Sequence, residues 1–573
     1  MKKALSCGRR WSRRGLKAVL APLVFGSASV GCGEGASLGT ISHSGAVVSV
    51  DDGDWHNPET WELGMVPSSG RVVIQADHSV RLDGNTTRAL ANVIVDGVLV
   101  FDPEQSVTLT TTGNVIVHDG GRIEMRPASA DVKHEIAFEE VDEEEFVGAP
   151  LPGSGSMAPC AGGDPSEPCD SDVGLWVLGS GVLDAVGSFK TSWTRLLGSA
   201  NAMDTAFSVE NHDGWRDGDE VVIVPTIAPT DEVEDEYWTG YDRGFLTINP
   251  DGTLSIGELQ HDHPRVNDQW GAEVLNLTRN VVIHGTAQGR AHVAFHHFQQ
   301  PQTLRFVEVH QMGPHKLGQP ILGRYGLHLH MGHDHARGSL LEGLSLHDLG
   351  FRAYVPHASH GVTIQDSIAH DIVDEAFWWD EGAVNDSHDA VWTRNVASKL
   401  GNNPNHNQGA FFLGNGKGNS VTESVAVGVK GDLRSAGFQW PDHAIQSAWT
   451  FNHNISHNNE AGGLFTWQNG NKVHVVEDSV AYHNGFGLLH GAYGNRYIYR
   501  NITLYGNRIG CDLHSSSTPS HVNAQTLDNF VIDGAGIGSW GFVVSETRAS
   551  SCRKAPSHSK PPSPMAVKPT PPA

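Results

Sequence analysis

The sequence predicts an all-β protein: a right-handed parallel β-helix preceded by a smaller β-roll. Two observations carry this prediction. The 573 residues include 66 glycines against 8 methionines, a composition typical of turn-rich β architecture. Short apolar or alternating runs, such as RVVIQ, NVIVDGVLVF and EVVIV, recur along the chain, whereas no apolar pattern is sustained at the helical period. A chain of this length is expected to form two or more packed units.

Residues 1–32 are expected to be an export signal. A basic stretch precedes an apolar run over residues 16–25, and small residues follow it. The run is too short and wrongly flanked for a spanning helix, and no other segment approaches the ~18 apolar residues that one requires. SVGC, ending at Cys32, resembles a lipoprotein cleavage box, although Ser29 stands where leucine is usual. We expect a secreted or outer-surface protein, with a lipid anchor at Cys32 as an open alternative.

Residues 45–127 are predicted to form the β-roll, because single glycines separate their short strands. Residues 128–300 read as a β-rich connecting region. Cys160 and Cys169 bracket a short Gly- and Pro-containing loop there, and we predict a disulfide between them because an exported protein can oxidise such a pair. Residues 301–545 are assigned to the parallel β-helix, and the Pro-rich residues 546–573 to a disordered tail.

Residues 340–510 hold a repeat of short stretches such as QDSIAH, TRNVAS and TESVAV. Their central residues lie 22 to 30 residues apart, about what one coil of a parallel β-helix needs, whereas propeller blades need about 40 residues or more. We expect each coil to bury its central residue on the next coil. The centres are Leu344, Ile368, Val396, Val425, Ile455, Val480 and Ile502.

A second strand follows each centre and begins with glycine or alanine, as in GLHLH, GFRAY and AFWWD. The next position is apolar in every coil, and cysteine in the last, so it is predicted to face the interior. These positions are Leu327, Phe351, Phe377, Phe411, Phe438, Leu464, Leu488 and Cys511. Because strand side chains alternate, the residues two and four after the start should point outward. On coils ~4.8 Å apart they include His328, His330, Arg352, Tyr354, Trp378, Asp380, Gln439 and Trp467.

The stretch RYGLHLHMGHDHARG, residues 324–338, is the most histidine-rich part of this surface. His328 and His330 lie two apart on one strand face, a spacing that can chelate a metal, and Asp334 in the following turn would complete the site. The alternative interpretation is a set of exposed, hydrogen-bonded polar side chains. The sequence leaves both open.

The remaining outward residues favour a polysaccharide ligand. Asp380 and Glu381 stand in FWWDEG, where a carboxylate beside tryptophan can have a raised pKa and act as a general acid; paired carboxylates are what glycoside hydrolysis uses. A solvated turn is the alternative. Arg352 would hold a carboxylate or sulfate of the substrate. The groups expected to bind sugar rings beside it are Tyr354, Trp378, Gln439 and Trp467.

The block WHNPETW…VP…VVI…LDG…VDGVLVF…GGRIEM resembles the G8 domain. The region YGLHLHMGHD…FWWDEGAVND is similar to a segment of the hyaluronan-binding, hyaluronidase and fibrocystin-like proteins that carry this domain. The resemblance covers residues of about 50–400 and implies an extracellular protein that binds or cleaves hyaluronan or a related polysaccharide, with calcium as a candidate cofactor. It adds His357 and Asn385 to the site. The chain departs from the family at Asp374-Glu375, where relatives commonly carry Gly-His.

The sequence therefore predicts an exported polysaccharide-active protein, and an enzyme of the glycoside hydrolase or polysaccharide lyase type is favoured. Asp380 or Glu381 would exchange protons beside His328, His330 and Arg352, and the metal would be calcium or a histidine-bound ion. A non-catalytic glycan-binding or adhesion protein is the alternative. The formal net charge of −26, with 33 histidines counted neutral, argues against nucleic acid as a partner because nothing would neutralise phosphates.

Overall fold

A computed structural model describes the parts of the chain on which the following sections rest. They are residues 45–86, 90–148, 168, 170–229, 239–316, 319–378, 386–401, 408–414, 416–431, 435–440, 448–466, 473–491, 496–516, 526–535 and 540–547. Within these ranges the chain forms β-strands and short 3-10 turns and no α-helix. No helix among the described residues is long and apolar enough to cross a membrane.

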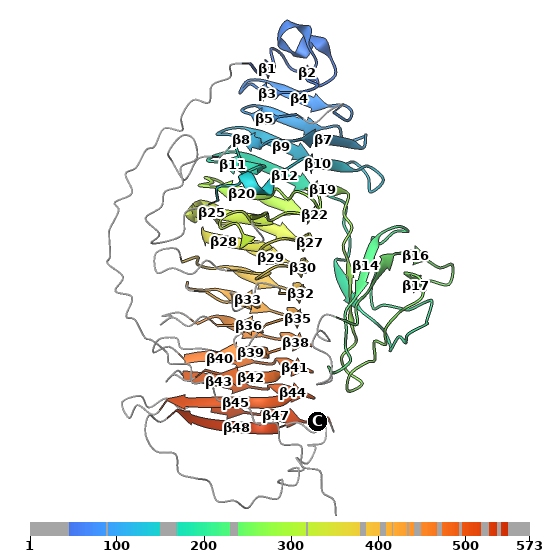
Figure 1. Ribbon diagram of the computed structural model, residues 1–573, viewed down its shortest axis with the longest axis vertical. Helices are drawn as coiled ribbons and strands as arrows, with labels where there is room; N and C mark the ends of the chain where they lie inside the picture. Colours follow the sequence, from blue (N-terminus) through green and yellow to red (C-terminus); the bar gives the residue numbers. More distant parts are fainter. Residues whose placement is uncertain are drawn as a thin grey trace, which may run out of the picture. The chain divides into compact units, whose positions relative to one another are not determined.

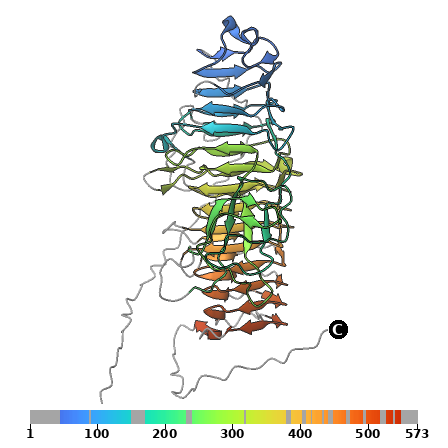
Figure 2. The same cartoon turned by 90° about the vertical axis from the view of Figure 1, so that its right-hand side faces the viewer.

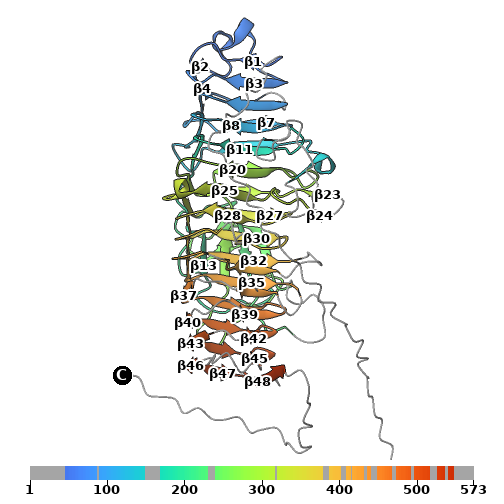
Figure 3. The same ribbon diagram turned by 90° about the vertical axis from the view of Figure 1, so that its left-hand side faces the viewer.

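Three stacks of parallel strands, with one strand of each stack in most coils, form a parallel β-helix (Figures 1 and 3), which confirms the predicted fold class. The first sheet contains β1 (Val47–Val48), β3 (Arg71–Ile74), β5 (Asn92–Val95), β8 (Val115–Val117), β11 (Gly174–Leu178), β20 (His292–His296), β25 (Leu327–His333) and β28 (Tyr354–Ser359). Through bridges at Phe377 it continues into β33 (Gly409–Phe412), β36 (Ala436–Gln439), β39 (Gly462–Thr466), β42 (Phe486–His490), β45 (Ile509–Ser516) and β48 (Trp540–Thr547).

The second and third sheets complete the coils. The second contains β7 (Val107–Thr111), β10 (His134–Phe138), β19 (Val281–His284), β22 (Val307–His310), β27 (Ser345–Leu349), β30 (Ile368–Ile372), β32 (Val396–Leu400), β35 (Val425–Val429), β38 (Ile455–His457), β41 (Val480–Tyr482), β44 (Thr503–Tyr505) and β47 (Val531–Asp533). The third contains β2 (Gly53–Asp54), β4 (Ser79–Leu82), β6 (Val98–Phe101), β9 (Arg122–Met125), β12 (Val182–Val186), β21 (Thr303–Arg305), β26 (Leu340–Glu342), β29 (Thr363–Gln365), β31 (Val391–Thr393), β34 (Ser420–Thr422), β37 (Thr450–Asn452), β40 (Val473–Glu477), β43 (Arg496–Arg500) and β46 (Thr526–Asp528).

Strands from residues 45–127 and strands from residues 301–545 belong to the same three sheets. One hydrophobic core accordingly runs from Trp55 to Cys511. The short 3-10 turns lie between strands. They are η1 (Pro58–Thr60), η2 (Glu62–Gly64), η3 (Glu143–Glu145) and η5 (Asp334–Ala336).

The inward column of the first sheet is a stack of rings. The rings of Phe377 and Phe411 lie 4.5 Å apart, and those of Phe411 and Phe438 lie 4.8 Å apart. These positions, with Leu327, Leu464, Leu488 and Cys511, are fully buried in the core, as predicted.

One coil breaks the predicted pattern. Tyr354, not Phe351, pairs with Leu327 and stacks on Phe377 at 4.7 Å, and its hydroxyl donates to the carbonyl of Ile368 at 2.9 Å. The expected outward position of Tyr354 is therefore wrong. The reason is that β28 begins at Tyr354. The preceding GFRA is a loop that leads into the strand, and Phe351 packs in a small separate cluster.

The column of central residues is in register from Ile368 to Val480, but it slips by one residue at both ends, where Ser345 and Thr503 take the positions expected for Leu344 and Ile502. The residues that follow the centres, such as Ala369 and Ala397, fill the core. The expectation that the centres are buried between coils is wrong for the five in this register, which point outward: Ile368, Val396, Val425, Ile455 and Val480. Three of these residues, Ile368, Val396 and Val425, are nevertheless buried.

An inserted antiparallel sheet buries these three residues. Its strands are β13 (Trp193–Arg195), β18 (Glu273–Asn276), β14 (Glu220–Ile223) and β15 (Asp242–Phe245), with the hairpin β16 (Thr247–Ile248) and β17 (Leu254–Ser255) nearby. The insert and the second sheet share one hydrophobic cluster, and Figure 2 shows it in front of the coils. A further hairpin joins β23 (His315–Lys316) to β24 (Gln319–Pro320).

A buried ion pair links the inserted sheet to the β-helix. Glu273 of the insert accepts from His457 Nε2 at 3.0 Å and from Arg195 Nε at 3.1 Å, and its side chain is fully buried. Burial opposes the charged carboxylate, but the attraction of His457 and Arg195 outweighs it and lowers the pKa of Glu273 to about 2.

We expect Glu273→Gln to destabilise the protein by about 3–5 kcal/mol at pH 7, because it breaks a buried pair. A carboxyl whose folded pKa is lowered contributes stability that is present above its unfolded pKa, near 4.5, and lost as the pH falls toward 2. The difference from wild type should therefore shrink over that interval, measured by denaturant unfolding.

Glu477→Gln is the matched control. Glu477 makes a partly exposed ion pair with Arg500, so its loss should change stability by about 1 kcal/mol at most. Equal stability of wild type and Glu273→Gln at pH 7 would contradict the prediction.

Candidate functional site

The outer face of the first sheet gathers histidines on β20, β25 and β28. Leu327 and Leu329 of β25 lie in the core. Because strand side chains alternate, His328 and His330 point outward. His330 pairs in register with His296 of β20 on one side and with His357 of β28 on the other. Strand alternation and in-register stacking thus bring imidazoles from three coils together.

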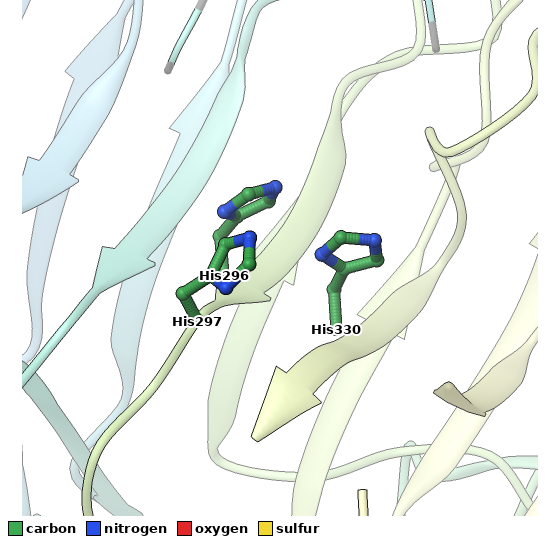
Figure 4. A group of neighbouring side chains, drawn as sticks. All are labelled: His296, His297 and His330. Atoms are coloured by element: carbon green, nitrogen blue, oxygen red, sulfur yellow. The ribbon is translucent and has the colours of Figure 1, made fainter. Parts of the chain in front are cut away.

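Five side chains form what we call the histidine cluster: His296, His297, His328, His330 and His357. The ring of His330 lies 4.5 Å from that of His296, 4.8 Å from that of His357 and 5.0 Å from that of His328. Figure 4 shows His296, His297 and His330 facing one another. His297 is exposed and His330 half-buried, while the other three are buried. The cluster is therefore accessible to solvent at His297 and His330.

Hydrogen bonding fixes the tautomer of His328. Its Nδ1 lies 3.1 Å from the carbonyl of Gly323 and must donate, so the proton of the neutral ring sits on Nδ1. The buried Nε2 has no hydrogen-bond partner, and neither has the buried Nδ1 of His330. Burial, followed by the neighbouring imidazoles, holds the pKa of both rings well below 6.5. Both are neutral at pH 7, and His328 keeps a lone pair.

Of the predicted metal ligands, the structure brings together only His328 and His330. Asp334 lies in η5 with a largely exposed side chain and pairs with Arg337 at 2.8 Å; it belongs to neither group of neighbouring ligand atoms found among the described residues. The interpretation of an exposed polar string fits His333 and His335 but not His328, which is 5% exposed.

Arg352 does not lie open to an anionic ligand. Its side chain is buried and pairs with Glu375 at 2.5 Å and Asp374 at 3.3 Å, and its guanidinium carbon lies 3.6 Å from the ring centre of Trp378. Burial opposes its charge, but the two carboxylates outweigh burial and raise the pKa of Arg352 above its ordinary value. The predicted anion clamp is a buried brace, because Arg352 belongs to the loop before β28.

The other predicted residues divide into two groups. Trp378 and Gln439 are on the outward side of the first sheet and are buried, at 6% and 5% exposure. Trp378 packs with Tyr325 and Phe351. Several predicted positions lie outside the described residues: Asp380, Glu381, Asn385, Trp467, Cys160 and Cys169.

The sequence interpretation missed His296 and His297. They precede Phe298 in the stretch HVAFHHF, residues 292–298, in which β20 repeats the alternation of LHLH one coil earlier. That alternation, followed by a second histidine, is the signal that would have found them.

The donor set of the cluster does not fit calcium. Calcium takes six to eight oxygen ligands, whereas the described groups of neighbouring ligand atoms contain imidazole nitrogens alone. Imidazoles are ligands of zinc, copper and nickel.

We expect Arg352→Met to destabilise the protein by about 3–5 kcal/mol, because Asp374 and Glu375 would stay buried without their cation. Arg337→Met is the control. Arg337 is exposed and also pairs with two carboxylates, Asp334 and Asp389, so its loss should cost about 1 kcal/mol or less. Equal unfolding midpoints for the two variants in urea would show that Arg352 is not needed to stabilise the buried carboxylates.

Comparisons with known proteins agree with this architecture. Residues 60–197 match the G8 domain and residues 288–463 match the CEMIP beta-helix. The chain is 22% identical to a G8 domain-containing protein of Dictyostelium discoideum over 401 residues, which are 69% of this chain and 32% of the relative. It is 23% identical to human fibrocystin-L over 379 residues, 57% of this chain and 8% of the relative.

The human cell surface hyaluronidase CEMIP2 is 23% identical over 207 residues, 30% of this chain and 14% of the relative. The chain thus spans about a third or less of the length of these relatives. The resemblance predicted from the sequence is confirmed: one part of the chain is similar to the G8 domain and another to the CEMIP beta-helix.

Proposed function

We propose that the chain cleaves an extracellular polysaccharide at the histidine cluster on the outer face of the first sheet. The observation that carries the proposal is the pair of buried, neutral imidazoles, His328 and His330, each with a ring nitrogen that has no hydrogen-bond partner. Neutral imidazoles beside an accessible edge are suited to accept a proton from a substrate or from a water molecule.

The site favours chemistry that begins with a base. Asp374 and Glu375 both face Arg352, so neither is placed to act as the acid of a carboxylate pair. The carboxylates expected from the sequence for that role are Asp380 and Glu381. In a lyase, a histidine would remove the proton beside a uronate carboxyl group; in a hydrolase, it would activate water.

The relatives guide the choice of substrate. One matched relative is named a cell surface hyaluronidase, and hyaluronan is therefore the first glycan to test, followed by other uronate-containing and neutral polysaccharides. We also propose that residues 1–32 direct export, with Cys32 as the site of a lipid anchor if one is attached.

A second candidate is a glycan-binding protein without catalysis. It is favoured by the pairing of Asp374 and Glu375 with Arg352, because neither of these carboxylates is then placed to supply the acid that glycoside cleavage needs.

We expect the purified protein to release new chain ends from hyaluronan or another polysaccharide of the panel. Reducing-end assays detect either reaction, and ultraviolet absorbance of an unsaturated end identifies a lyase. His328→Ala should slow the reaction by about 100-fold or more, as the loss of a general base does. His335→Ala, an exposed histidine of the same stretch, should leave the rate unchanged. Binding without product from any polysaccharide would establish the second candidate instead.

The pH profile tests the protonation state. Because the pKa of His328 and of His330 is lowered, activity that needs neutral rings should persist as the pH falls through 6.5 and decline only in stronger acid. The initial rate from pH 4 to pH 8 at constant ionic strength measures this. A rate that increases below pH 6.5 would show that an imidazolium is required.

A further inference from the structure

The histidine cluster contains two overlapping sets of three imidazoles. One set is His296, His297 and His330, and the other is His328, His330 and His357. Within each set, one nitrogen of every ring lies within 4.8 Å of the others. His330 belongs to both sets.

The strand order explains why His330 is shared. β25 lies between β20 and β28, so His330 has His296 as its partner on one side and His357 on the other. An imidazole carries two nitrogens on different sides of its ring. Figure 4 shows one nitrogen of His330 directed toward His296 and His297, which leaves the second on another side of the ring.

His328 is arranged as a metal-binding histidine usually is. A ligating histidine almost always donates its other ring N–H to a carbonyl, carboxylate or water, and His328 donates from Nδ1 to the carbonyl of Gly323 while its buried Nε2 lacks a partner. An unsatisfied buried polar atom costs about 1–3 kcal/mol. A metal ion at this nitrogen would remove that cost.

A second row of stacked histidines in the same protein provides a contrast. On the second sheet the rings of His284, His310 and His347 lie 4.9 and 5.2 Å apart. There His347 has Asp348 at 2.8 Å and Glu308 at 3.4 Å as acidic partners, and this row forms no set of three neighbouring ligand atoms among the described residues. Stacking along a β-helix therefore does not by itself produce the arrangement found on the first sheet.

We propose that the cluster is a binuclear site for divalent late transition metals of the zinc class. In this site His330 releases its ring N–H proton to solvent on metal binding and, as an imidazolate, provides one nitrogen to each ion. Three imidazoles on each ion leave a coordination position for water or a substrate oxygen. Nitrogen ligands select such metals over calcium. With metal bound, the ring nitrogens are ligands, and the base of the proposed reaction would be a water held at the open coordination position.

The test is the metal content of the full-length, untagged protein after equilibrium dialysis against Zn²⁺ or Co²⁺, with calcium in excess as a competitor. Wild type should bind two ions per chain, and calcium should displace neither. His297→Ala and His357→Ala, which each remove a ligand of one set, should bind one ion. His330→Ala should weaken both ions by about tenfold or more, the scale on which even outer partners of a metal act.

Two controls separate the cluster from other histidines. His335 lies in the exposed stretch after β25, and His310 lies in the stacked row of the second sheet. The variants His335→Ala and His310→Ala should both still bind two ions. Unfolding midpoints of the metal-free variants check that each protein is folded. Copper loaded in place of zinc tests directly whether His330 binds both ions. Two copper ions bridged by one imidazole give a magnetically coupled electron paramagnetic resonance spectrum.

Unchanged binding in His330→Ala, or displacement by calcium, would overturn the site. A stoichiometry of one ion in wild type, or an uncoupled copper spectrum at full loading, would overturn the shared ligand. Metal binding as expected without cleavage of any glycan would reject the proposed function and leave the metal site standing.

Discussion

The stacked inward rings of the first sheet determine the rest of the candidate site. Tyr354, Phe377, Phe411 and Phe438 lie at successive coils with ring separations of 4.5 to 4.8 Å. Because strand side chains alternate, a shift of one residue in this column would turn every outward side chain inward. The stack thereby keeps His330 and His357 in register on the outer face. The chemistry of that face depends on the packing of residues that never reach it.

Local alternation was sufficient to predict the β-helix, most of the inward column and the outward direction of His328 and His330. It failed where two registers satisfied the same pattern. GFRAY permits either Phe351 or Tyr354 to enter the core, and the decision comes from tertiary packing, since Phe351 instead meets Tyr325 and Trp378. The outward direction of Ile368, Val396 and Val425 could not be predicted either, because the sheet that covers them ends about 90 residues before the first of them.

The same face accommodates polar groups in two physically different ways. At Arg352, charge is kept and compensated by Glu375 and Asp374. At His328 and His330, charge is avoided, since burial lowers the pKa of each ring. In the first arrangement the charge of Arg352 is already paired within the protein. This explains why an arginine that the sequence suggested for anion binding is not available to an anionic ligand. Only the second arrangement leaves atoms available for a ligand.

The inserted sheet gives the two outer surfaces different uses. On the second sheet it covers Ile368, Val396 and Val425, and Arg243 of the insert meets Asp348 next to the stacked histidines. The acidic residues there complete an internal contact and leave those rings with partners inside the protein. On the first sheet, by contrast, the described residues place imidazoles against imidazoles, with no carboxylate in either ligand set. Among the described residues, the histidines of the second sheet thus have acidic partners that support the fold, whereas those of the first sheet are the group that we propose binds a ligand.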